Sequence, residues 1–353
     1  GKRFLTVAGN ELRIWSLLPL PAAQGSFAHD EPVHTVFFSE DGSHLVTGCG
    51  TGKMWTWDPS TGKSIGSPVV SPRPVAAIAF APDQCSVLCA DEDGRLFVWD
   101  AEERQFVETE VRVPSSHRIA ALHPDGDRFI VAKRRVDWTA NQGELQCWSL
   151  KTGGRVLPVM EQPGREINTA AFSPDGKTVA VGNYDGHITF WNATTGEQLS
   201  GLIQTPVPGG VRAVSYSPNG QYLAASRRDN RVWIYDAETR EPVAVPVKQP
   251  QGIHGFNFSP DSRWVVIGAA DDRWDNQGSA SVRVWDVARG KPIGPGLPGA
   301  RIMNMVAFNP DATLVCSANR TGNARLWRVP EPLAGDVETV IRWGEALTAQ
   351  EVD

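Results

Sequence analysis

The chain has 353 residues, of which 41% are hydrophobic, enough for the core of one large domain or two smaller ones. Charged residues make up only 21%, while 34 glycines and 26 prolines are typical of short strands joined by tight turns, so a disordered chain is excluded. The formal charge of -6 argues against nucleic acid as a partner, and no apolar run is long enough to cross a bilayer.

The cysteines are odd in number and mostly lie in apolar, strand-like segments: Cys49, Cys85, Cys89, Cys147 and Cys316. Buried thiols of this kind are typical of a reducing compartment. No charged and then apolar segment opens the chain, so we expect a cytoplasmic protein with no membrane segment.

Along the chain, the first expected elements are two short strands at residues 4–7 and 12–15. They have the pattern of the second and third strands of a four-stranded unit whose first strand is missing. Residues 1–23 are therefore predicted to form a partial repeat. An outer strand is expected next, at residues 24–28.

Repeated units fill the rest of the chain, and each ends its third strand on an aromatic residue. These aromatic residues lie about 42 to 50 positions apart, the length of a four-stranded propeller blade. They are Trp15, Trp57, Trp99, Trp148, Trp191, Tyr235, Trp285 and Trp327. Around Trp191, strands are expected at residues 169–173, 178–182, 188–191 and 198–202.

Several recurring segments carry a family resemblance. Residues 172–176 (Phe-Ser-Pro-Asp-Gly), 258–261 (Phe-Ser-Pro-Asp) and 97–100 (Phe-Val-Trp-Asp) resemble the repeat of the WD-repeat (WD40) family. The resemblance covers nearly the whole chain and implies an all-β fold, a WD40-type β-propeller with four-stranded antiparallel blades. Seven blades are favoured, because residues 24–28 can supply the fourth strand that is missing after Trp327, and eight blades are the alternative.

This division places the β-propeller at residues 24–330 and a carboxy-terminal tail at residues 331–353, with a short helix at 335–349. Residues 325–348 resemble the ending of bacterial WD-repeat proteins in which a propeller follows a serine/threonine kinase. That resemblance implies a kinase domain on the same polypeptide as a candidate partner.

The chain departs from the family in its polar residues. Animal-type repeats often hydrogen-bond the third-strand tryptophan to a histidine and an aspartate. Only His29 occupies the histidine position, and Thr51 and Thr321 replace the aspartate in two units. We therefore expect the blades to depend on apolar packing between neighbouring sheets.

Signals for catalysis or metal binding are weak. Residues 48–53 lack a phosphate-loop glycine, Cys85 and Cys89 lack a second ligand pair, and residues 91–94 lack the glutamate that closes a calcium loop. We predict no catalytic residue, metal or cofactor, hence a protein that is not an enzyme. A propeller hydrolase with a metal in the central channel is the weakest alternative.

Two insertions between second and third strands stand out, at residues 134–143 and 271–278, and each contains a tryptophan followed by Asn-Gln-Gly. They are either lengthened hairpins, with each tryptophan on its own blade, or a pair of recognition loops. The candidate partner-binding residues are Trp138, Trp274, Arg134, Arg135, Asn141, Gln142, Asn276, Gln277, Arg227, Arg228 and Arg320.

Antiparallel strands place the connections of each unit on two opposite faces. The upper face, with the second-to-third-strand and between-unit connections, is expected to be locally basic from Arg134, Arg135, Arg165, Arg212, Arg227, Arg228, Arg273, Arg301 and Arg320. The lower face is expected to be acidic from Asp41, Asp83, Asp125, Asp175, Asp261 and Asp311.

These features predict a scaffold that binds a peptide or protein partner, acidic or phosphorylated, on the upper face. The alternative is a regulatory or substrate-recruiting domain of a bacterial serine/threonine kinase.

Overall fold

A computed structural model of the chain describes residues 2–8, 11–17, 26–71, 75, 77–80, 87–100, 103–115, 117–133, 142–163, 166–204, 210–244, 246–249, 252–270, 280–298, 303–319, 322–329 and 331–332. Every helix or strand element in these ranges is a β-strand, and all the strand pairs are antiparallel. Over the same ranges, no helix with the length and hydrophobicity to cross a bilayer occurs. The helix predicted at residues 335–349 lies outside the described residues.

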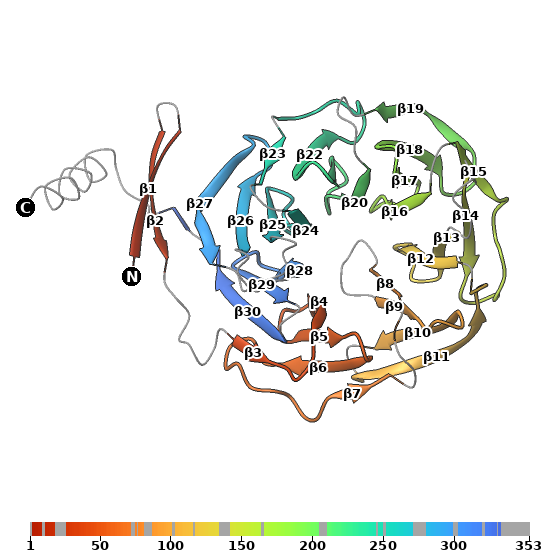
Figure 1. The fold of residues 1–353 in the computed structure, drawn as a ribbon, viewed down its shortest axis with the longest axis horizontal. Coiled ribbons are helices and arrows are strands. Elements are labelled where there is room, and N and C mark those ends of the chain that lie inside the picture. Colours follow the sequence, from red (N-terminus) through yellow and green to blue (C-terminus); the bar gives the residue numbers. More distant parts are fainter. Residues whose placement is uncertain are drawn as a thin grey trace, which may run out of the picture.

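Seven four-stranded sheets form a ring around a central channel, with the first strand of each sheet innermost (Figure 1). We number these blades 1 to 7. Blades 1 to 3 consist of β4 (Val33–Phe38), β5 (Leu45–Cys49), β6 (Lys53–Trp57) and β7 (Val69–Val70); β8 (Ala77–Phe80), β9 (Val87–Ala90), β10 (Arg95–Asp100) and β11 (Gln105–Arg112); and β12 (His117–Leu122), β13 (Arg128–Lys133), β14 (Gln142–Ser149) and β15 (Met160–Pro163).

The remaining blades have the same order, except that the outer strand of blade 7 comes from the start of the ring. Blades 4 to 7 consist of β16 (Ile167–Phe172), β17 (Thr178–Asn183), β18 (His187–Asn192) and β19 (Gln198–Gln204); β20 (Val211–Tyr216), β21 (Tyr222–Arg227), β22 (Arg231–Asp236) and β23 (Val247–Lys248); β24 (Gly252–Phe258), β25 (Trp264–Ala270), β26 (Ala280–Asp286) and β27 (Lys291–Pro298); and β28 (Met303–Phe308), β29 (Leu314–Asn319), β30 (Asn323–Arg328) and β3 (Ser26–Ala28). The prediction of seven four-stranded blades is confirmed.

Blade 4 shows how the local sequence determines the strands. Its four strands cover the segments expected around Trp191, each within a few residues at its ends. The turn between β16 and β17 favours glycine, because Gly176 adopts a left-handed φ of 69° and a Cβ there would lie too close to His123 Nε2. Ser173 Oγ donates to Asp175 Oδ1 at 2.6 Å and so holds that turn in place. The Ser-Pro-Asp-Gly motif is therefore a turn signal.

The core is divided among the blades, because one apolar cluster lies between each pair of neighbouring sheets. Trp191 is 4% exposed in the cluster between blades 3 and 4, as its position predicts. Trp285 is only partly buried against the cluster between blades 5 and 6. The described thiols of Cys49, Cys89, Cys147 and Cys316 are all buried, and burial raises the pKa of Cys89 to about 12.

The ring is closed by β3, which pairs with β30 as the fourth strand of blade 7. Phe27 of β3 is 1% exposed, and the centre of its ring lies 5.1 Å from the ring centre of Trp57 in blade 1. His29 Nε2 is hydrogen-bonded to Thr47 Oγ1 at 2.7 Å, and Trp57 Nε1 donates to the same oxygen at 2.8 Å. Burial lowers the pKa of His29, so this link contains a neutral imidazole. The segment that closes blade 7 is thus also anchored to blade 1.

A smaller sheet lies outside the ring. It contains β1 (Lys2–Ala8), β2 (Glu11–Leu17) and β31 (Glu331–Pro332), in the order β1-β2-β31, and it lies beside β27 (Figure 1). This is the order that the second, third and fourth strands of a blade would have. The assignment of residues 1–23 to a partial repeat, and of residues 331–353 to a tail, stays a prediction.

We predict that Phe27→Ala lowers the free energy of unfolding by about 3–5 kcal/mol, because it empties a buried site at the ring closure. Denaturant titration measures the loss. Val107→Ala is the control, since Val107 lies on the outer strand β11 and is 45% exposed, and it should cost under about 1 kcal/mol. Equal losses in the two variants would show that β3 does not hold the ring closed.

Candidate partner-binding face

The upper face carries the connections between second and third strands and those between blades. At its centre, most inner strands contain a β-bulge close to their first residue. The extra residue is Asn168 in β16, Arg212 in β20 and His254 in β24. Because the bulges lie near the first residues of the innermost strands, these three residues are placed at the upper end of the channel.

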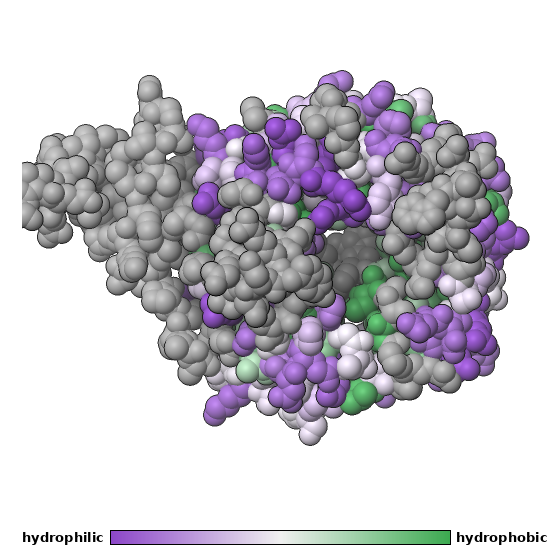
Figure 2. All heavy atoms as spheres, in the orientation of Figure 1, coloured by the Kyte–Doolittle hydropathy of each residue, from purple (hydrophilic) through white to green (hydrophobic). Residues whose placement is uncertain are grey.

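The bulge side chains connect neighbouring blades. Asn168 Nδ2 donates to the carbonyl oxygen of Val211 at 2.7 Å, and Arg212 Nη1 donates to the carbonyl oxygen of Ile253 at 3.2 Å. Blades 4, 5 and 6 are thereby linked in series along the rim. Figure 2 shows hydrophilic residues beside the central hollow over β20, β22 and β24, with hydrophobic residues on part of its wall.

An aromatic and a cationic side chain extend this rim outward. Arg228, exposed in the β21–β22 turn, places its guanidinium carbon 4.9 Å from the ring centre of Tyr184 in the β17–β18 turn. The two turns are fixed by backbone hydrogen bonds from Arg228 to Gly210 and from Tyr184 to Glu166. A guanidinium held over an aromatic ring keeps its edge available for an anion.

Arg227 does not lie on this surface, although its neighbour does, so its predicted place in an exposed arginine group is wrong. It is the last residue of β21 and is 0% exposed, because both faces of this strand are buried. Burial lowers the pKa of its guanidinium, and the charge of Asp229 opposes part of that shift. Arg227 is a structural residue of blade 5.

Charge is unevenly distributed over the upper face. Lys53 of blade 1 forms an ion pair with Glu31 at 2.6 Å, which neutralises that sector. Glu92 and Asp93 are exposed in the β9–β10 turn of blade 2. Within the described residues, Arg228 of blade 5 is an exposed arginine of this face, whereas this turn of blade 2 is acidic and blade 4 exposes Asp185. A locally basic upper face therefore stays a prediction.

Most of the other predicted site residues lie outside the described residues: Trp138, Trp274, Arg134, Arg135, Asn141, Asn276, Gln277 and Arg320. Gln142 begins β14, but its side chain is not described. The two insertions do connect second to third strands, β13 to β14 and β25 to β26, in blades 3 and 6. Sequence patterns did not single out Asn168, Tyr184 or His254 as site residues, because no residue signal marks the bulges.

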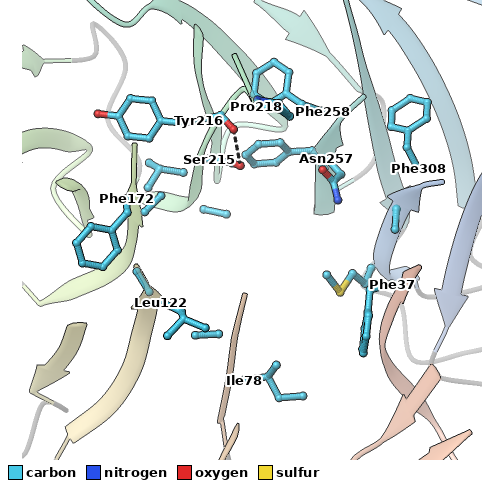
Figure 3. Close-up of a pocket in the computed structure, with 18 of the residues that line it drawn as sticks. Phe37, Ile78, Leu122, Phe172, Ser215, Tyr216, Pro218, Asn257, Phe258 and Phe308 are labelled. Carbon is cyan, nitrogen blue, oxygen red and sulfur yellow. Dashed lines mark hydrogen bonds between the residues drawn. The ribbon is translucent and has the colours of Figure 1, made fainter. Parts of the chain in front are cut away.

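The channel itself contains a cavity of about 610 Å³ lined by the inner strands of all seven blades (Figure 3). Its described lining is mainly apolar and includes one carboxylate, Glu40, with no histidine or cysteine. Across the described residues, no three His, Cys, Asp or Glu side chains are grouped as a metal site. Residues 50–52 and 91–94 form turns between second and third strands, so the phosphate-loop-like and calcium-loop-like segments belong to ordinary blade hairpins.

Comparison with known sequences agrees with this architecture. Residues 23–58, 66–100, 155–192 and 202–236 match the family described as WD domain, G-beta repeat. A seven-bladed ring with four-stranded blades and this repeat is a WD40-type propeller. The chain belongs to the WD-repeat family.

Several WD-repeat proteins of eukaryotes are similar to the chain. The chain is 27% identical to Autophagy-related protein 16 of Arabidopsis thaliana, over 54% of this chain and 36% of that protein. It is 21% identical to Protein tipD of Dictyostelium discoideum, over 87% of this chain and 47% of that protein. It is also 27% identical to Target of rapamycin complex subunit wat1 of Schizosaccharomyces pombe, over 54% of this chain and 61% of that protein. The chain therefore spans less than two thirds of each of these relatives, and the kinase resemblance stays a prediction.

We predict that two adjacent substitutions lower the stability by very different amounts. Arg227→Glu replaces a buried guanidinium with a buried carboxylate and should cost about 3 kcal/mol or more in unfolding free energy. Arg228→Glu changes an exposed side chain and should cost less than about 1 kcal/mol. Denaturant titration of both variants is the measurement, and similar losses would contradict the assignment of Arg227 as structural.

Proposed function

We propose that this chain is a non-catalytic scaffold whose upper face binds an acidic or phosphorylated segment of a partner protein. The observation that carries the proposal is the pair formed by Arg228 and Tyr184, which joins the upper turns of blades 4 and 5. Guanidinium groups form strong, directional hydrogen bonds to carboxylates and phosphates. An exposed arginine beside an aromatic ring is also a composition typical of binding hot spots.

The surrounding charges favour one orientation of such a segment. The acidic turn of blade 2, with Glu92 and Asp93, lies three blades away from Arg228 in blade 5. An acidic segment is attracted to Arg228 of blade 5 and repelled from the acidic turn of blade 2, so its charged end is expected to lie at blade 5. Charge complementarity of this kind contributes more to specificity and association rate than to affinity.

The names of the relatives support a role in assemblies. One similar protein is named as a subunit of the Target of rapamycin complex, and another as a WD repeat-containing protein. A rigid ring that presents loops on one face suits a binding role. A regulatory or substrate-recruiting domain of a bacterial kinase is the second proposal, and it depends on the resemblance of residues 325–348. A kinase catalytic segment encoded upstream of Gly1 would favour it.

Binding of acidic probes tests the proposal directly. We predict that a fluorescently labelled phosphoserine peptide with flanking glutamates binds the chain, that added salt weakens binding, and that Arg228→Glu weakens it about tenfold. Lys151→Glu is the matched control, because Lys151 is exposed in a third-to-fourth-strand turn on the opposite face. Absence of binding, or equal affinity for both variants, would refute an acidic partner on this face.

The paired insertions give a second test. If they clamp the partner, Trp138→Ala and Trp274→Ala should each weaken binding by about 2 kcal/mol or more, with a much smaller change in stability. If each tryptophan packs on its own blade, the same variants lose stability and affinity stays unchanged. Calorimetric titration of the partner and denaturant titration of the free protein distinguish the two results.

A further inference from the structure

The cavity in the channel belongs to its lower half. Its walls include Pro218, Pro260 and Pro310, which lie in the turns after the inner strands, on the lower face. The bulge residues of the upper rim, such as Asn168 and Arg212, do not line it. The cavity is thus lined by a different set of residues from those of the arginine rim.

Small side chains on the inner strands leave this space open. In most blades, the penultimate residue of the inner strand is small. Examples are Ala79, Ala171, Ser215 and Ala307. The last residue is usually aromatic and fills the interfaces between blades, as Phe172 and Phe258 do (Figure 3). The cavity therefore has a mainly apolar wall and a volume within the usual range for bound side chains or small ligands.

Carboxylates surround the lower mouth. The turns after the inner strands expose Asp41, Asp125, Asp175, Asp261 and Asp311. Hydrogen bonds from Ser39 and Ser43 lower the pKa of Asp41 to about 2, so its carboxylate is charged at neutral pH. Some of this charge is neutralised locally, since Arg128 Nε lies 2.8 Å from Asp125 Oδ2.

Glu40 differs from the other acidic residues, because it both lines the cavity and is exposed. Its carboxylate forms no hydrogen bond or ion pair with any residue that the structure describes. A negative charge at the edge of an apolar pocket favours a ligand that combines a cation with an apolar group.

We propose that the lower half of the channel is a docking site for a basic peptide segment, which inserts one bulky apolar side chain into the cavity and places a lysine or arginine beside Glu40. The apolar side chain gains the free energy of burial, while the flanking cations are attracted to the carboxylates around the mouth. The ring then holds two partners of opposite charge, one on each face. This site does not depend on the acidic partner proposed for the upper face.

Labelled peptides with a central tryptophan flanked by arginines test the site by fluorescence anisotropy. The matched probes replace the tryptophan with alanine, or the arginines with glutamates. We expect the tryptophan-arginine peptide to bind about tenfold or more tightly than either control, since both the apolar and the cationic groups contribute. Equal binding of the alanine peptide, or no binding at all, overturns the proposal.

Variants of the chain locate the binding. Ala171→Phe fills the cavity and Glu40→Lys reverses the charge at its edge, and each should weaken binding about tenfold. Glu238→Lys is the control for charge, because Glu238 is exposed in the third-to-fourth-strand turn of blade 5, on the same face but away from the cavity. Equal effects of Glu40→Lys and Glu238→Lys would show only a diffuse attraction and overturn the site.

Cross-linking keeps the test decisive if Ala171→Phe does not fold. A peptide with benzoylphenylalanine in place of tryptophan, irradiated with the unaltered chain, should attach to inner-strand residues such as Ile78 and Ser215. Attachment to the upper rim, at Tyr184 or Arg212, would overturn the proposal. A small apolar dye that binds in the cavity should compete with the peptide, and binding of both at once would also overturn the proposal.

Discussion

Ring closure by β3 is the constraint on which the rest of this structure depends. A propeller blade buries its sheet faces only against its two neighbours, so an open ring would expose two apolar sheet faces and an unpaired edge. Pairing of β3 with β30 covers the free edge of β30, and Phe27 and His29 of the same segment attach blade 7 to Trp57 and Thr47 of blade 1. One short segment therefore fixes the positions of both faces and of the channel.

The closure, and most of the fold, could be predicted from the sequence because their signals are local. Residues 24–28 have a strand pattern but belong to no complete unit, while the unit of Trp327 lacks a fourth strand. The spare strand therefore predicts the missing one, and β3 does pair with β30. The turns are equally readable, since Ser173, Asp175 and Gly176 each have a separate role in one turn. Signals of this kind require no knowledge of contacts between distant segments.

The binding face was less predictable, because it depends on the direction of single side chains. Arg227 and Arg228 are identical residues in sequence, yet the first ends a strand and is buried while the second begins a turn and is exposed. A bulge displaces Arg212 from the alternation that its strand would otherwise follow. Register shifts of one residue leave no trace in composition, whereas they decide which groups reach the mouth of the channel.

The carboxylates of the lower face follow from turn chemistry. The turns after the inner strands use aspartate to accept hydrogen bonds from serine and backbone donors, so folding alone places carboxylates on the lower face. The turns between second and third strands have no such uniform requirement, and arginines can occupy them. Glu40 lies in a turn after an inner strand, and Arg228 lies in a turn between a second and a third strand. Backbone hydrogen bonds hold both turns, so neither charge is needed for the turn. Because the apolar clusters between blades supply the stability, the residues of the rims can change with the partner while the ring is preserved.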